Sequence, residues 1–413
     1  MTRNQNIRRA VADFCAREHG AQARLLAELV KVPSDNPPGD CAAHAERAAA
    51  LLEALGLSVE RHPVPDDLVQ ANGMVSATNL VVREQFGGGP MVALNAHGDV
   101  VPPGEGWSTD PYGAEIRDGW MYGRGVAVSK SDFATYAYAL LVLKSLGASL
   151  AGAVELHLTY DEEAGGAIGP KWLLEQGLTK PDLALSAGFA YGIVTAHNGC
   201  LHLEVQITGK SAHAARPETG HDALEGAARV LNALYAHRND LANIHSAVDG
   251  IDSPTLVVGL IKGGINTNVV PDAVTLRLDR RIIPEEDGAG VERGLTRLIQ
   301  DSVAGPPGIG CTVRRIMLAE PLKPVPGLER LARPLQRNAE AVFGQSVPTY
   351  GVPLYTDARH YAAAGIPTVL YGAGPRTLAE ANAHAADERL PLADLRKATE
   401  VVALTLLDLL AGS

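Results

Sequence analysis

The sequence has few cysteines, no long apolar run and no excess of basic charge, and each absence narrows the class of protein. Four of the 413 residues are cysteine and none forms a CxxC pair, so we expect free thiols in a reducing compartment rather than disulfides. No apolar run reaches the roughly 18 residues of a membrane span, and the polar N-terminal segment has no apolar signal-peptide core. We therefore expect a cytoplasmic protein without a membrane partner.

The balance of charge argues against a nucleic-acid partner. The net charge is −11, whereas neutralising phosphates requires an excess of Lys and Arg. Hydrophobic residues make up 46% and charged residues 20% of the chain, which is typical of globular proteins. A chain of 413 residues has room for two or three domains, or for one large domain with an insertion.

Strands and helices alternate in the first half of the sequence, which predicts an α/β fold with helices on both faces of a sheet. In such sheets, sites lie at the carboxyl ends of the strands. The expected helices cover residues 7–31, 41–56 and about 130–147, and the expected strands cover 79–84, 91–97 and 154–160.

The pattern changes near residue 198. The segment "CLHLEVQITGKSA" alternates as a half-buried strand does, and the order that follows reads β-α-β-β-α-β. That order predicts a ferredoxin-like α+β insertion over 198–312. Residues 1–197 and 313–413 would then form the larger domain.

Two segments at predicted strand ends could carry chemistry. His97 and Asp99 flank a glycine, and a metal-bound imidazole usually has its other nitrogen held by a carboxylate or carbonyl. The triplet Asp161-Glu162-Glu163 places like charges side by side, which a metal would relieve. Taken alone, the first segment also fits an ordinary hydrogen-bonded histidine, and the second fits a solvated acidic turn.

Two further histidines lie in loops beside helices. His384 lies in "ANAHAADERL", before a final helix, and also fits a surface histidine. His213 lies in "GKSAHAARPETGHDAL", between a strand and a helix of the insertion.

These segments occur in an order that resembles the M20 family of metallopeptidases and amidohydrolases, which includes glutamate carboxypeptidase, acetylornithine deacetylase and succinyl-diaminopimelate desuccinylase. The resemblance covers essentially the whole chain. The other segments that carry it are "GWSTDPYGAEIRDGWMYGRG", "YDEEAGG", "GGINTNVVPDAVTLRLDRR" and "TDARHYAAAGIPTVLYGAG".

The resemblance implies roles for individual residues. His97, Glu163 and His384 match metal ligands, Asp99 matches the residue that orients His97, and Glu162 matches the general base that deprotonates metal-bound water. The remaining matches lie in the inserted lid or dimerisation domain: His213 would reach the neighbouring subunit's active site and polarise the scissile carbonyl, and Asn268 and Arg281 would bind substrate groups. Arg281 also fits a structural ion pair.

Two positions depart from the family pattern. Val128 and Gly188 stand where the family has acidic ligands, and both ligands belong to the metal that His97 would bind. An isopropyl group cannot coordinate a cation, and two cations about 3.5–4 Å apart need an anionic bridge. We therefore expect one divalent metal, zinc in preference to manganese or cobalt, held by three protein ligands and water.

Other departures leave alternatives open. Asp132 lies one helical turn beyond Val128 and would be either a substitute ligand or an exposed helix residue. Phe189, Leu354 and Tyr355 are bulkier than the family pattern, and they would either reshape the pocket for a flatter substrate or serve in packing.

The expectation is therefore a homodimeric metallohydrolase that cleaves an amide (C–N) bond of a small N-acyl amino acid, dipeptide or aryl amide. Two alternatives remain. One is a non-catalytic small-molecule-binding relative, and the other is a two-metal deacylase with substitute ligands.

Overall fold

The computed structural model describes residues 3–146, 149–305 and 307–412, and the chain divides into two compact units. The first comprises Met1–Thr195, Pro324–Tyr350 and Thr356–Ser413, and the second comprises Ala196–Lys323 and Gly351–Tyr355. The insertion expected over 198–312 covers most of the second unit. Residue 312 itself lies inside a strand, β12, whose pairing with β9 keeps the chain in the second unit up to Lys323.

The main sheet is mixed, with strand order β1-β2-β6-β3-β7-β14-β8-β13. β3 runs parallel to β6 and β7, and β14 runs parallel to β7. β2 pairs antiparallel with β1 and β6, and β8 pairs antiparallel with β14. The expected α/β fold is confirmed. The strands are β1 (Val59–Pro63), β2 (Thr78–Gln85), β3 (Met91–His97), β6 (Ala153–Thr159), β7 (Leu183–Ser186), β8 (Ile193–His197), β13 (Thr349–Val352) and β14 (Thr368–Leu370).

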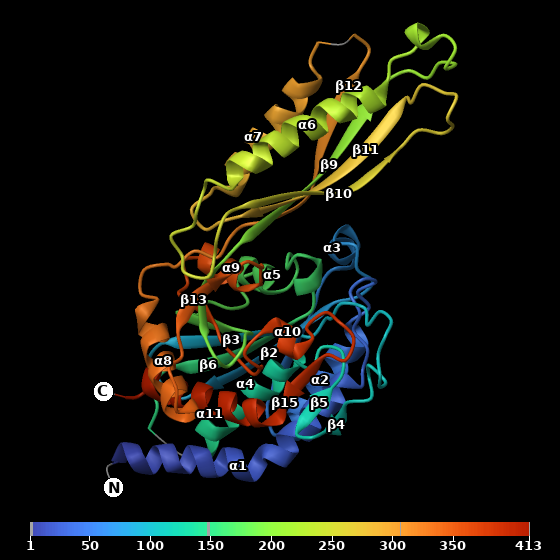
Figure 1. Cartoon of the computed structure of the whole chain (residues 1–413). Helices are drawn as coiled ribbons and strands as arrows, with labels where there is room; N and C mark the ends of the chain where they lie inside the picture. Colours follow the sequence, from blue (N-terminus) through green and yellow to red (C-terminus); the bar gives the residue numbers. More distant parts are fainter. Residues whose placement is uncertain (1–2, 147–148, 306, 413) are drawn as a thin grey trace. The chain divides into compact units, whose positions relative to one another are not determined.

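Helices cover both faces of this sheet. Figure 1 shows α4 and α11 on one side of it and α5 and α9 on the other. The strands between them are therefore buried on both faces, which is why every residue of β6 is buried, including the polar residues Glu155, His157 and Thr159 that alternate with its apolar ones. The helices of this unit are α1 (Arg3–Val30), α2 (Ala42–Ala54), α3 (Asp66–Ala71), α4 (Lys130–Leu146), α5 (Pro170–Glu175), α8 (Glu329–Phe343), α9 (Ala358–Ala363), α10 (Leu378–Ala381) and α11 (Leu392–Leu409).

The parallel pairing of β3 with β6 determines where polar side chains gather. The register places His97 beside Thr159, the last residue of β6. Since the carboxyl ends of parallel strands meet at one edge of a sheet, the acidic triplet that follows β6 lies close to the turn that follows β3.

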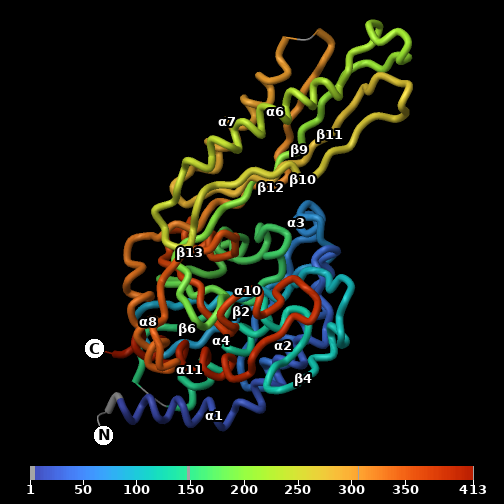
Figure 2. Tube along the Cα trace, viewed as in Figure 1, coloured from blue at the N-terminus to red at the C-terminus, as the bar shows by residue number. Residues whose placement is uncertain are grey.

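The second unit has the predicted β-α-β-β-α-β order, with strand order β10-β11-β9-β12 and every pair antiparallel. Its helices pack on one face, against alternate apolar residues of β9; Figure 2 traces this unit from β9 in green to β12 in orange. The elements are β9 (Gly199–Thr208), α6 (Ala223–Leu241), β10 (Thr255–Gly263), β11 (Ala273–Ile282), α7 (Gly288–Val303) and β12 (Gly310–Ala319).

A small antiparallel sheet of β4 (Glu115–Arg117), β5 (Trp120–Tyr122) and β15 (Arg389–Pro391) was not predicted. Strands of three residues are too short to show a period in the sequence. Beside this sheet, the N–H of Gly123 donates to the carbonyl of Glu388 at 2.9 Å, which brings a late acidic residue next to the turn before α4.

Among the residues described, none of the helices combines the length and the apolar character that crossing a bilayer requires.

Candidate active site

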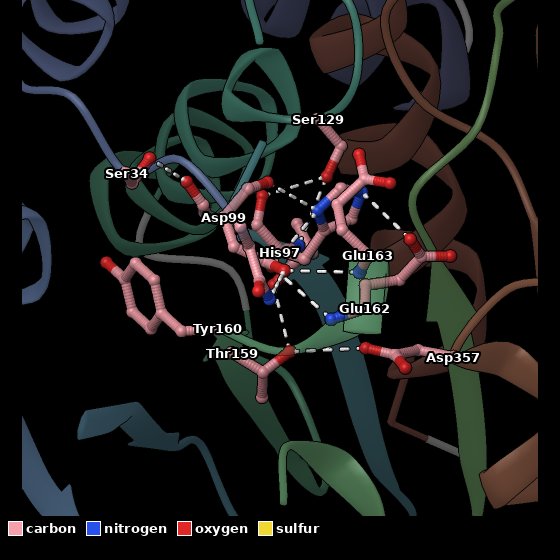
Figure 3. A network of polar contacts seen from close by, with 12 residues as sticks. Ser34, His97, Asp99, Ser129, Thr159, Tyr160, Glu162, Glu163 and Asp357 are labelled. Atoms are coloured by element: carbon pink, nitrogen blue, oxygen red, sulfur yellow. Dashed lines mark hydrogen bonds and ion pairs between the residues drawn. The ribbon is translucent and has the colours of Figure 1, made fainter. Parts of the chain in front are cut away.

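The expected site residues of the first unit meet at the carboxyl ends of β3 and β6. One ligand atom from each of His97, Glu162 and Glu163 lies within 4.8 Å of the other two. Figure 3 shows these side chains together with Asp99 and Ser129. The two segments identified separately in the sequence therefore form a single cluster.

His97 is oriented by the turn that follows it. Its Nδ1 donates to the main-chain carbonyl of Asp99 at 2.9 Å, because a carbonyl oxygen can only accept, and the Asp99 carboxylate lies 3.4 Å from the same nitrogen. Both contacts of Nδ1 thus come from Asp99, and its carbonyl makes the closer one. The other ring nitrogen, Nε2, lies 4.0 Å from Glu162 Oε2 and is the atom that a neutral imidazole would offer to a cation.

The fully buried carboxylate of Asp99 joins the two turns. It accepts the backbone N–H groups of Glu162 at 3.3 Å and of Glu163 at 3.1 Å, and the side-chain amide of Asn36 at 3.0 Å. These bonds place the backbone of both glutamates relative to His97. The charge of Asp99 is therefore solvated by protein dipoles rather than by water.

Glu163 connects the cluster to His384. Its Oε1 lies 3.2 Å from His384 Nε2, which is close enough for an ion pair. This buried oxygen nevertheless accepts no hydrogen bond from the residues that the structure describes. A buried carboxylate oxygen without a hydrogen-bond donor fits a cation between the two side chains. The His384 ring is half exposed and lies beside the His97–Glu162–Glu163 cluster rather than in it.

The electrostatics of the site favour a positive charge at its centre. Burial raises the pKa of the Glu162 carboxyl well above its usual range, although His97 opposes the shift. Burial alone would lower the pKa of His97, but Glu162, Asp99 and Glu163 together raise it. A divalent cation would relieve the repulsion between these carboxylates.

The backbone at position 128 is held by hydrogen bonds, although the Val128 side chain cannot bind metal. The N–H groups of Ala127 and Val128 donate to the buried carboxylate of Glu388 at 3.0 and 3.1 Å. The hydroxyl of Ser129, which follows a cis peptide bond, lies 3.1 Å from both the N–H and the carbonyl of His97. Val128 itself packs against the apolar core.

Gly188 leaves no space for a carboxylate. A Cβ at this position would lie 2.8 Å from the backbone nitrogen of Tyr371 and 3.0 Å from the carbonyl carbon of Leu370. Restoring an acidic side chain here would therefore require the backbone to move.

Asp132 is not the exposed helix residue that was one of the two alternatives considered from the sequence. It is fully buried, and its carboxylate accepts the N–H of Ala373 at 2.8 Å and that of Gly188 at 3.1 Å. Because α4 begins at Lys130, its first turn directs this side chain between two loops. Asp132 thus joins the backbone of these two loops behind the site.

Two acidic residues near the site were not assigned from the sequence. Asp161 and Asp357 are both buried, and Asp357 Oδ2 accepts from the hydroxyl of Thr159 at 3.4 Å. Burial raises the pKa of Asp357 to about 6 and raises that of Asp161 well above its usual range. The "TDARH" segment carried the signal, since an acidic residue stands there before a helix.

The remaining predicted residues lie in the second unit. The exposed His213 and Asn268 are on adjacent loops, because the N–H of Ala214 donates to the carbonyl of Asn268 at 3.0 Å. Arg281 pairs with Asp279 at 3.0 Å and lies 6.0 Å from the ring centroid of Tyr355. The ion pair considered as an alternative for Arg281 is therefore present.

Comparisons with known proteins show which family the sequence resembles. Residues 93–408 match the model of peptidase family M20/M25/M40. The chain is 28% identical over 393 residues to a succinyl-diaminopimelate desuccinylase of Gluconacetobacter diazotrophicus, covering 92% of this chain and 94% of that one. It is 30% identical over 365 residues to an acetylornithine deacetylase of Myxococcus xanthus, covering 86% and 89%.

A solved structure, the dinuclear metal-binding M20 peptidase of Bacillus subtilis, superposes with a TM-score of 0.69. The alignment covers 95% of this chain and 99% of the peptidase at 16% identity. At that identity the likeness concerns the fold alone.

The buried ion pair between Arg124 and Glu388 should be essential to the folded state. The pair spans 2.6 Å, and each side chain is 1% exposed. Glu388→Gln leaves a buried charge unpaired, so we expect a loss of about 3–5 kcal/mol in the free energy of unfolding, measured by urea denaturation. The control Glu84→Gln breaks the partly exposed pair with Lys144 and should cost under about 1 kcal/mol. Equal losses of unfolding free energy in the two variants would contradict a larger contribution from the buried pair.

Asp132 should make stability depend on pH. Burial raises its pKa from 3.8 to about 8, against two backbone hydrogen bonds that lower it. Between these values the folded chain binds more protons than the unfolded one, so its stability falls as pH rises. Urea unfolding of wild type and Asp132→Asn across this window should show a steeper fall for wild type. Parallel pH profiles would rule out a buried, titrating Asp132.

Proposed function

The chain belongs to peptidase family M20/M25/M40, and on this premise we propose that it is a hydrolase that cleaves the amide bond of a small N-acyl amino acid, dipeptide or aryl amide using one divalent cation per active site. The observation that carries the proposal is the convergence of His97, Glu162 and Glu163 at the ends of β3 and β6. An imidazole nitrogen and a buried carboxylate oxygen without a hydrogen-bond donor meet there.

The proposed metal site uses His97, Glu163 and His384. A mixed set of imidazole and carboxylate donors suits zinc, with manganese or cobalt as substitutes. When bound, the cation supplies a Lewis acid that polarises the scissile carbonyl and acidifies a water molecule.

The ligand side chains of the described residues favour one cation over two. Val128 and Gly188 supply no side-chain donor atom, and Asp132 is fully buried with its carboxylate directed at the backbone N–H groups of Gly188 and Ala373. A second ion would therefore lack its anionic bridge. This argues against the alternative of a two-metal deacylase with substitute ligands.

In the proposed mechanism, Glu162 is the general base. Its carboxylate lies beside His97 in the cluster, and burial raises its pKa well above its usual range, which makes the carboxylate a better proton acceptor. It removes a proton from the attacking water and delivers it to the leaving amine. Asp99 keeps Glu162 in place through the backbone N–H.

We further propose that the second unit contributes the substrate contacts. His213 donates to the developing oxyanion in the active site of a partner chain, and Asn268 and Arg281 bind polar and carboxylate groups of the substrate. The role of His213 implies a homodimer. Exposed apolar side chains on and near the edge strand β10 support this inference. These side chains are Val257, Leu260, Ile261 and Ile265.

The division of labour between the two glutamates provides the first test. Glu162→Gln should keep the metal and lower kcat by about 10²–10⁴-fold, because it removes a base and no ligand. Glu163→Gln should hold one ion fewer per chain than wild type, measured by elemental analysis. The activity assay uses N-acyl amino acids, dipeptides and aryl amides with added zinc, manganese or cobalt.

Three outcomes would overturn the proposal. A wild-type chain that binds these compounds without turnover would be a binding protein. Loss of two ions in Glu163→Gln would mean a dinuclear centre. Metal loss in Glu162→Gln would make that residue a ligand instead of the base.

His213 is tested by kinetics and by mixing chains. His213→Ala should lower kcat by about 10²–10³-fold at unchanged metal content, since an oxyanion donor acts on the transition state. If His213 serves the partner's site, mixed dimers of His213→Ala and Glu162→Gln chains regain activity, because one site then has both groups intact. Mixed dimers as inactive as the parent dimers would contradict a role across the interface.

A further inference from the structure

A second group of metal-ligand atoms lies in the second unit, on residues that the proposed reaction does not use. Cys200 Sγ lies 3.2 Å from His202 Nε2, and that nitrogen lies 2.9 Å from Asp279 Oδ2. The third separation, from Cys200 Sγ to Asp279 Oδ2, is 3.8 Å. Three donor atoms of different type therefore surround one point.

The pairing of β9 with β11 creates this group. The register places His202 directly opposite Asp279, and Cys200 lies two residues away on the same face of β9. That face is opposite the one on which Leu201 and Leu203 pack in the core beneath α6 and α7. Cys200 is buried, while the side chains of His202 and Asp279 are 35% and 31% exposed, so a cation could enter from solvent.

The hydrogen bonds within the group converge on one oxygen. His202 Nε2–H and the Cys200 thiol both point at Asp279 Oδ2, at 2.9 and 3.8 Å. This geometry also excludes a relay through the imidazole, because a relay needs its two partners on different ring nitrogens. A cation would bind all three donors at once.

We propose that Cys200, His202 and Asp279 form a second metal site, for a zinc-class divalent cation that joins β9 to β11. Zinc distances of about 2.3 Å to sulfur and about 2.0–2.2 Å to nitrogen and oxygen place tetrahedral donors ~3.3–3.6 Å apart. The separations of 3.2, 2.9 and 3.8 Å each lie within about 0.4 Å of that range. Water completes the coordination, and the thiol releases its proton to solvent on binding.

Arg281 supports the proposed site by donating hydrogen bonds to Asp279. Its Nε and Nη2 donate to the two oxygens of Asp279 at 3.0 and 3.3 Å. Hydrogen bonds of this kind orient a carboxylate ligand, and Oδ2 retains a second lone pair for the cation. Asp279 is thus held in place before metal arrives.

Cobalt tests the site without reference to activity. After removal of metal with a chelator, Co²⁺ is titrated into the full-length reduced protein while the near-ultraviolet sulfur-to-cobalt charge-transfer band is recorded. We expect a band that saturates at one cobalt per chain and disappears in Cys200→Ala. His202→Gln and Asp279→Asn, at partly exposed positions, should weaken cobalt binding at least about tenfold. Circular dichroism confirms that each variant is folded.

Two control variants separate this site from other thiols and from the proposed active site. Cys311→Ala removes the half-buried thiol of β12 and should leave the band unchanged. Glu163→Gln removes an active-site ligand that has no sulfur, so the band should persist even if the proposed hydrolase mechanism is wrong. Absence of a band in the folded wild type, its survival in Cys200→Ala, or unchanged affinity in His202→Gln would each overturn the proposal.

Discussion

The candidate active site depends on the buried carboxylate of Asp99. It accepts N–H groups from Asn36, Glu162 and Glu163, and the carbonyl of the same residue receives Nδ1–H of His97. One residue therefore orients an imidazole and holds the backbone of two carboxylates. Because β3 and β6 are parallel neighbours, a single carboxylate can serve both turns. Without Asp99, the like charges of Glu162 and Glu163 would be free to separate.

The same principle of compensated charge explains the surroundings of the site. Glu388 is neutralised by Arg124 and holds the loop that contains Val128, while Asp132 is solvated by the backbone beside Gly188. The two positions that lack the expected ligands therefore lie on ordered backbone. The backbone at both positions is held by hydrogen bonds, although neither Val128 nor Gly188 offers a side-chain donor for a cation.

The sequence predicted the fold class, the insertion and the clustering of His97 with Glu162 and Glu163, because apolar runs and strand ends are local signals. It could not predict contacts that depend on register or on helix rotation. Asp132 sits in the first turn of α4, where burial depends on the tertiary packing of that turn. Cys200 and Asp279 lie far apart in the sequence, and only the pairing of β9 with β11 brings them together.

The most direct test of the central claim is a crystal structure grown with zinc, with diffraction recorded on both sides of the zinc absorption edge. The account predicts one anomalous peak in the first unit, bonded to His97 Nε2 and Glu163 and close to His384, with Glu162 beside it but unbound. Two peaks about 3.5–4 Å apart, or only solvent between Glu163 and His384, would contradict it.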